Sequence, residues 1–140
     1  WDSITTGPSH ASYANYKGTS ALSEPESKAL ANLANSANWT MTISYHSMGN
    51  LVYWDFAGNK VAEQSKALAE LVTGITGYRI NRSSGKGGFK AYVQIKDSPI
   101  PSLTIEVGSV ACPMPVSEFG NVWNSNQSIL AALAAYAADH

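Results

Sequence analysis

The sequence predicts an α/β fold in which a mixed, largely parallel sheet has helices on both faces. Segments with the two-residue apolar period of strands alternate along the chain with segments that have the period of amphipathic helices. Strands separated by helices are typically parallel neighbours in one sheet, and those helices cover it. At 140 residues, 44% of them hydrophobic, the chain is long enough for one domain with its own core.

The first helix is predicted over residues 24–36, after a stretch of polar residues with little periodicity. Ser23 and Glu26 have the spacing of a capping box, and Pro25 suits the first helical turn. Apolar side chains then recur at helical spacing, at Ala29, Leu30, Leu33, Ala34 and Ala37.

The period changes to two in residues 39–46, which predicts a strand that ends at His46. Residues 51–54 form a further extended segment, and residues 60–72 read as a second amphipathic helix. The tryptophans on these and later apolar faces are expected in the core; they are Trp39, Trp54 and Trp123.

Residues 74–88, "GITGYRINRSSGKGG", are rich in glycine and basic groups and are expected to form a long loop. Residues 101–109 alternate again and predict a strand with Glu106 near its carboxyl end. A closing helix is expected from Glu118 onward, densest in apolar residues over 128–138.

Composition excludes some classes of partner. The formal net charge of −1 and the charged fraction of 14% argue against nucleic acid and against an anionic membrane surface. The most apolar run, 129–138, is too short to span a bilayer. Cys112 is the single cysteine, so an internal disulfide is impossible, and we expect a buried, inert thiol. The expected partners are therefore small or neutral molecules.

Two titratable residues, His46 and Glu106, fall at predicted carboxyl ends of strands, where open α/β sheets bind their ligands. An imidazole and a carboxylate could serve as a zinc ligand and as the general base for a zinc-bound water. A buried histidine beside a surface glutamate is the alternative. The spacing cannot decide between them, because a catalytic zinc site needs three protein ligands and the chain has no H-x-x-E or H-E-x-x-H pair.

A serine nucleophile at Ser47 is a weaker alternative. The stretch Tyr45 to Gly49 superficially matches the G-x-S-x-G nucleophile elbow. However, Tyr45 stands where the elbow needs a small residue, and the segment that follows looks extended instead of helical. The downstream histidine that a triad needs could only be His140.

Four blocks in order, "GTSALSEPESKAL", "ISYHSMGNLVYW", "GYRINRSSGKGGFKAY" and "PSLTIEVGSVACPMP", resemble the C-terminal half of a zinc carboxypeptidase of the carboxypeptidase A type. The likeness is greatest to a bacterial branch that resembles γ-D-glutamyl-diaminopimelate peptidases. It implies a secreted or cell-wall-associated metallopeptidase that cuts cell-wall peptides. By the same resemblance, His46 is a Zn²⁺ ligand, Glu106 activates a zinc-bound water, and Ser47 and Thr104 line the substrate pocket.

The chain also departs from the family pattern. The H-x-x-E motif and the Asn-Arg pair of the family lie upstream of a tryptophan that resembles Trp1. We therefore expect residues 1–140 to be the C-terminal portion of a catalytic domain whose N-terminal half is a missing partner. Alone, the chain should be inactive, with an incomplete zinc site. The tyrosine that closes over substrate in the family is replaced by Ile80 or Asn81, with Tyr78 nearby but out of register.

Three basic residues, Arg82, Lys86 and Lys90, lie near the region with which family members bind the substrate side chain. A diaminopimelate residue carries an extra carboxylate, which such a cation could pair with. The alternative for each is a solvated loop charge. A non-catalytic binding module or pseudoenzyme with the same fold is the competing interpretation of the whole chain.

Overall fold

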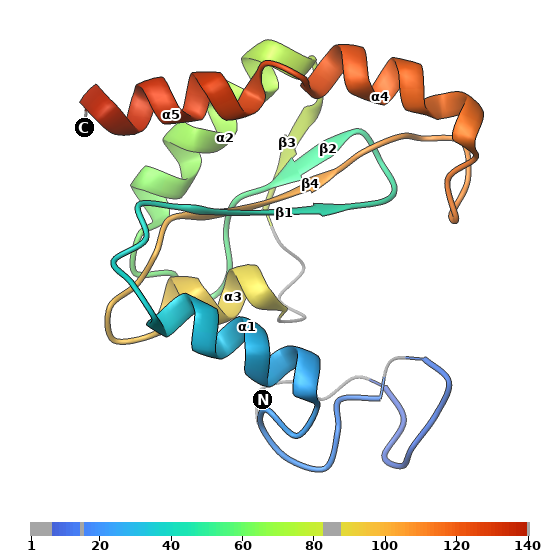
Figure 1. Ribbon diagram of the computed structural model, residues 1–140, viewed down its shortest axis with the longest axis vertical. Helices are drawn as coiled ribbons and strands as arrows, with labels where there is room; N and C mark the ends of the chain where they lie inside the picture. Colours follow the sequence, from blue (N-terminus) through green and yellow to red (C-terminus); the bar gives the residue numbers. More distant parts are fainter. Residues whose placement is uncertain (1–6, 15, 83–87, 140) are drawn as a thin grey trace.

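The computed structural model describes residues 7–14, 16–82 and 88–139. Four strands form one sheet in the order β1-β4-β2-β3 (Figure 1). Their bounds are Thr42–His46 for β1, Leu51–Tyr53 for β2, Arg79–Asn81 for β3 and Ser102–Glu106 for β4. β1 runs parallel to β4 and β2 parallel to β3, whereas β2 and β4 are antiparallel. The predicted mixed, largely parallel sheet is confirmed.

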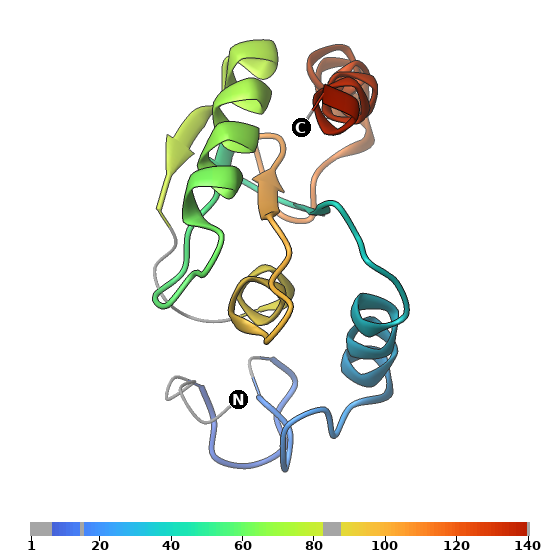
Figure 2. The same cartoon turned by 90° about the vertical axis from the view of Figure 1, so that its left-hand side faces the viewer.

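Helices lie on both faces of this sheet (Figures 1 and 2). On one side are α2 (Ala62–Thr76), α4 (Phe119–Asn126) and α5 (Ile129–Asp139). On the other side are α1 (Pro25–Asn35) and α3 (Phe89–Ile95). A short 3-10 helix, Val116–Glu118, precedes α4. No helix among the described residues has the length and apolarity that a membrane span requires.

The main core lies between the sheet and the α2/α5 layer. Leu103 and Ile105 of β4 and Val52 of β2 are fully buried there, because alternate residues of a strand point to the same face. The helices contribute buried residues at helical spacing, which are Leu68, Ala69, Val72, Ile129 and Leu133. The opposite face of β4 therefore presents the intervening residues, Ser102, Thr104 and Glu106, toward the α1/α3 side.

Several predicted boundaries were wrong. β1 begins at Thr42, and Trp39 lies before it with 42% of its surface exposed. Trp123 is also exposed, whereas Trp54 packs against the core. The capping box does not form, because Ser23 Oγ donates to the Glu24 carboxylate and no side chain caps α1.

The region predicted as one long loop contains regular structure. α2 continues to Thr76 and is ended by Gly77 in the left-handed conformation. β3 follows with three exposed residues, so it has no apolar pattern and is held by backbone pairing to β2. α3, which follows the predicted loop, was not predicted at all, because two of its buried residues, Lys90 and Gln94, are polar. The closing helix is in fact two helices, α4 and α5, separated by a turn.

Candidate functional site

His46 and Glu106 are neighbours at one end of the sheet. The parallel pairing of β1 with β4 places them as Cα partners, although sixty residues separate the strands in sequence. In-register residues of adjacent strands lie about 5 Å apart and point to the same face. His46 is exposed and Glu106 is half-buried. The arrangement can therefore present an imidazole and a carboxylate side by side to solvent.

Two turns support this end of the sheet. After β1, the N–H groups of Gly49 and Asn50 both donate to the carbonyl oxygen of Gly108, at 2.7 and 3.1 Å. Gly108 itself has a φ of 70°, and a Cβ there would overlap Met114 Sδ. Val107 N donates to the His46 carbonyl at 2.8 Å. The backbone around the two titratable residues is thus fixed by hydrogen bonds between the turns that follow β1 and β4.

Ser47 lies exposed at the start of the first turn, and its Oγ is 3.8 Å from Cys112 Sγ. No histidine contact of Ser47 is found among the described residues, and His140 lies outside them. The geometry offers nothing that would activate a serine nucleophile. Cys112 is exposed, so the expectation of a buried thiol was wrong. Thr104 lies on the same face of β4 as Glu106, two residues before it.

The donor set does not fit a complete zinc site. Within the described residues there is no group of three or more His, Cys, Asp or Glu side chains that could hold a metal ion. Catalytic zinc takes three protein ligands. His46 could supply one of them and the neighbouring Glu106 could act beside the metal, so any further ligands must come from elsewhere.

The basic residues meet at a different place from His46 and Glu106. Tyr53 pairs with Thr104 in the antiparallel β2–β4 ladder, so the chain that leaves β2 runs away from Glu106. Asp55 therefore lies roughly four residues, or about 13 Å, from Glu106 along the β4 direction. Arg82, which follows β3, and Lys90, in the first turn of α3, both contact Asp55. Lys86 lies outside the described residues.

Asp55 binds the two cations through different groups. Arg82 donates from Nε to Asp55 Oδ2 at 2.8 Å, and its Nη2 donates to the same oxygen. Lys90 Nζ donates to the Asp55 backbone carbonyl. The Arg82 guanidinium lies 5.5 Å from the centre of the Trp54 ring, and Lys90 Nζ lies 5.9 Å from that of Phe56. Sequence reasoning missed Asp55, and an acid directly after an apolar strand was the signal that could have shown it.

The pKa values of Lys90 and Asp55 are both lowered, although for different physical reasons. Burial lowers the pKa of the Lys90 ammonium to about 8, and the charge of Asp55 opposes part of this shift. Burial raises the pKa of the Asp55 carboxyl, but hydrogen bonds from Arg82 and Asn59 outweigh it and hold that pKa below its usual value. The Asp55 carboxylate is therefore charged at neutral pH, and Lys90 titrates close to neutral pH.

The residues at the family lid position lie in regular structure. Ile80 and Asn81 are exposed residues of β3. Tyr78 packs against the core, and its hydroxyl accepts a hydrogen bond from Asn126 Nδ2 at 3.0 Å. Burial, together with nearby Tyr78, raises the pKa of Tyr45. None of these contacts brings Tyr78 toward Glu106.

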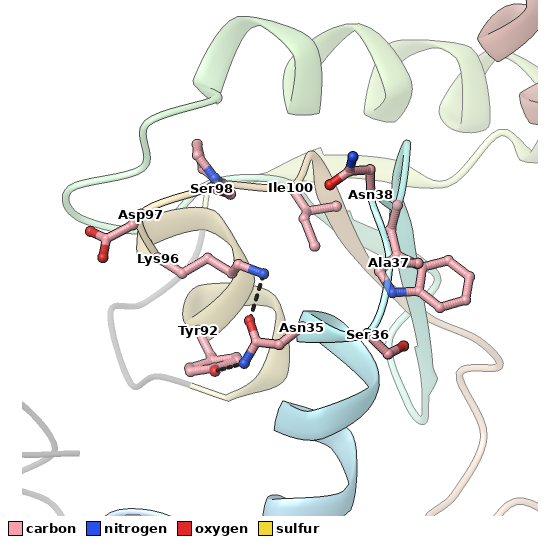
Figure 3. Close-up of a pocket in the computed structure, with 11 residues that line it drawn as sticks. Asn35, Ser36, Ala37, Asn38, Tyr92, Lys96, Asp97, Ser98 and Ile100 are labelled. Carbon is pink, nitrogen blue, oxygen red and sulfur yellow. Dashed lines mark hydrogen bonds between the residues drawn. The ribbon is translucent and has the colours of Figure 1, made fainter.

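Three hollows border α1, and one of them, of about 490 Å³, lies between α1, α3 and the segment that precedes α1. An apolar groove of about 580 Å³ runs between α1 and β1 and includes His46 in its lining. A polar pocket of about 800 Å³ lies at the opposite, N-terminal ends of β1 and β4 (Figure 3). In that pocket Lys96 Nζ donates to Asn35 Oδ1 at 2.8 Å, and Asn35 Nδ2 donates to the Tyr92 hydroxyl at 3.2 Å. These groups bind one another, so the groove at His46 is the more relevant hollow for chemistry.

Comparison with known proteins adds a family match. The model of the family described as "Zinc carboxypeptidase" matches residues 1–127. The chain is 31% identical over 119 residues to Gamma-D-glutamyl-L-diamino acid endopeptidase 1 of Lysinibacillus sphaericus. The match covers 84% of this chain and 30% of that protein. It is 27% identical over 128 residues to the Uncharacterized protein YqgT of Bacillus subtilis (strain 168). This match covers 88% of this chain and 33% of that protein. The chain spans about a third of the length of these relatives.

Proposed function

We propose, from the premise that this chain belongs to the zinc carboxypeptidase family, that it forms part of a zinc metallopeptidase acting on bacterial cell-wall peptides. The observation that carries the proposal is the in-register pairing of His46 with Glu106 at the carboxyl ends of two parallel strands. The similarity to a protein named as a γ-D-glutamyl-L-diamino acid endopeptidase supports the class of substrate. An extracellular or cell-wall location follows from that substrate.

In this proposal the two residues have different roles. His46 provides one imidazole ligand for the metal, which when bound would polarise the scissile carbonyl and acidify water. Glu106 takes a proton from the attacking water and later gives it to the leaving amine. Its half-buried position suits both steps, because partial desolvation strengthens its interaction with the developing charge while the site stays open to water.

Arg82, Lys90 and Asp55 form a cationic cluster, which would bind the acidic end of the substrate. Asp55, which both cations contact, lies about 13 Å from Glu106 along β4, a span that an extended diamino-acid side chain and its neighbouring backbone can bridge. Thr104 would line the path, since it lies between Glu106 and the level of Asp55 on the same face of β4. Ser47 follows His46 on the opposite side of Glu106, and its sequence-based role in the pocket stays a prediction. The sequence-based role of Lys86 in this pocket stays a prediction.

The remaining part of the site would come from another portion of the domain. β1 is an edge strand among the described strands, and the groove beside it is lined by apolar side chains that include Leu30, Leu33, Trp39, Met41 and Ile43. An unpaired strand edge beside an apolar groove favours the addition of further structure. The N-terminal half of the domain, supplying the other zinc ligands, would meet both needs.

The test uses the full-length protein that contains this segment. Glu106→Gln should lower kcat on a γ-D-glutamyl-diaminopimelate peptide by about 100-fold or more, because general acid–base catalysis contributes about that much. Zinc content should be unchanged. The matched control is Glu70→Gln, which alters an exposed carboxylate on α2 that pairs with Lys66. Undiminished hydrolysis by the Glu106→Gln protein would refute the assignment.

A second function, that of a non-catalytic binding module, is favoured by one observation, the lack of a three-ligand group in the described residues. Zinc analysis of the full-length protein separates the two. Stoichiometric zinc that His46→Ala reduces supports the peptidase. A zinc-free protein that binds the peptide without cleaving it supports the module.

A further inference from the structure

Asp55 is the one described residue that contacts both cations of the cluster. It follows β2, whereas Arg82 follows β3 and Lys90 belongs to α3, so three separate segments converge on it. Its carboxylate binds Arg82 and its backbone carbonyl binds Lys90. Asp55 is 7% exposed and Lys90 is 5% exposed, while 75% of the Arg82 side chain is accessible. The cluster therefore has a buried centre and one solvent-facing cation.

The charges of the three groups do not cancel. Two cations face one carboxylate, so the cluster carries a net charge of +1 while Lys90 is protonated. Arg82 binds the Asp55 carboxylate directly. The negative charge of that carboxylate also offsets part of the cost of burying the Lys90 ammonium. One additional carboxylate from a ligand would neutralise the cluster and favour the charged form of Lys90.

We infer that Asp55 is a positioning residue, which holds the exposed Arg82 guanidinium beside the buried Lys90 ammonium, so that Arg82 donates to a single carboxylate of the substrate and the charge of Lys90 stabilises that carboxylate from beneath. The inference rests on the proposed function for the identity of that substrate. It adds Asp55 to the residues of the proposed substrate pocket. It also predicts specificity: a substrate that presents a free carboxylate to Arg82 and Lys90 should bind better than one that presents a neutral amide there.

The inference also predicts how binding depends on pH. Asp55 is the charged group that acts on Lys90, and Arg82 binds the carboxylate of Asp55. Without the negative charge, Lys90 should lose its proton at a pH about one unit lower. Asparagine still offers an amide oxygen to Arg82, so the loss concerns charge more than hydrogen bonding.

The experiment follows the Lys90 side chain by NMR in the full-length protein that contains residues 1–140, labelled with ¹⁵N-lysine, with and without meso-diaminopimelate, from pH 6 to 10. Compared with the unsubstituted protein, Asp55→Asn should lower the midpoint of the Lys90 titration by about one pH unit, and Asp55→Glu should restore that midpoint. Arg82→Gln, which removes the positive charge but keeps an amide that can donate to Asp55, should raise the midpoint. Asp97→Asn, at a fully exposed carboxylate, is the matched control and should leave it unchanged.

Affinity for meso-diaminopimelate provides the second measurement. Asp55→Asn should weaken binding about fivefold at pH 8, where Lys90 loses its proton, and less than twofold at pH 6, where Lys90 keeps it. The loss of the negative charge of Asp55 itself acts in the opposite direction, so tighter binding of meso-diaminopimelate by Asp55→Asn would also overturn the inference. An equal loss at both pH values, or a Lys90 midpoint that neither Asp55→Asn nor Arg82→Gln moves, would overturn the inference. If the midpoint moves as expected but meso-diaminopimelate never binds, the link between Asp55 and Lys90 is supported and the proposed substrate is wrong.

Discussion

Replacing the buried lysine, Lys90→Met, should change how the stability of the chain depends on pH. The folded-state pKa of Lys90 is lowered to about 8 from the usual 10.5 because its ammonium is buried. Between these two values the unfolded chain holds a proton that the folded chain has lost. Stability therefore rises with pH across this window, since folding is favoured wherever the unfolded state binds more protons.

The size of this effect follows from the two pKa values. Below pH 8 both states carry the proton, and the folded state bears the full cost of the buried charge. From pH 7 to pH 9.5 the free energy of unfolding should increase by about 2 kcal/mol through Lys90 alone. Methionine has a similar length and does not titrate, so the Lys90→Met protein should lack this increase.

Urea unfolding of both proteins at pH 7 and pH 9.5, followed by circular dichroism, measures the difference. The upper limit of pH 9.5 avoids the titration of Tyr45, whose raised pKa lowers stability only above its usual value of 10. Comparing the two proteins at each pH removes the contribution of all other groups. Equal pH dependence in both proteins would refute the burial argument, and so would a fall in the stability of the unchanged chain relative to Lys90→Met.

Two further predictions concern stability at the sheet and at the site. Gly108→Ala should cost about 2–3 kcal/mol, because alanine is strained at a φ of 70° and its Cβ would overlap Met114 Sδ. Gly58→Ala, at a φ of 83° where a Cβ would meet only Ile95 Cγ2 at 4.0 Å, should cost about 1 kcal/mol. Similar losses for both in urea unfolding would contradict the contact with Met114. Leu103→Ala should lower the free energy of unfolding by about 3–5 kcal/mol, because Leu103 is fully buried in β4. Leu130→Ala, at a residue 66% exposed, is the control and should lower it by less than about 0.5 kcal/mol. A small loss of stability in Leu103→Ala would refute the place of Leu103 in the core.

Periodicity predicted the elements that bury one face. The strand ending at His46, the strand containing Glu106 and the helix over 60–72 all have an apolar face that meets the core, so their local pattern reports their environment. β3 and α3 escaped prediction for the opposite reason. β3 is exposed and depends on its pairing with β2, and α3 buries a lysine and a glutamine. A pattern of apolar residues cannot reveal an element whose stability comes from distant polar partners.

Gln94 illustrates that limit. It is fully buried in α3, and its Nε2 donates to the carbonyl oxygens of Trp54 and Ser102 at 2.7 and 3.0 Å. The three residues are far apart along the chain or on different elements, so no local spacing connects them. The side chain nevertheless joins the end of β2, the start of β4 and α3, and so helps to place Asp55 beside Lys90.

By itself, the sequence determined the α/β class, the placement of His46 and Glu106 at carboxyl ends of strands, and a resemblance to the family that the comparisons then showed. The tertiary structure decided which groups meet. Strand order and register bring His46 to Glu106, and the antiparallel direction of β2 carries Asp55 to the other end of the sheet with Arg82 and Lys90. The physical reason is that local periodicity depends on neighbouring residues, whereas register depends on backbone hydrogen bonds between strands far apart in sequence.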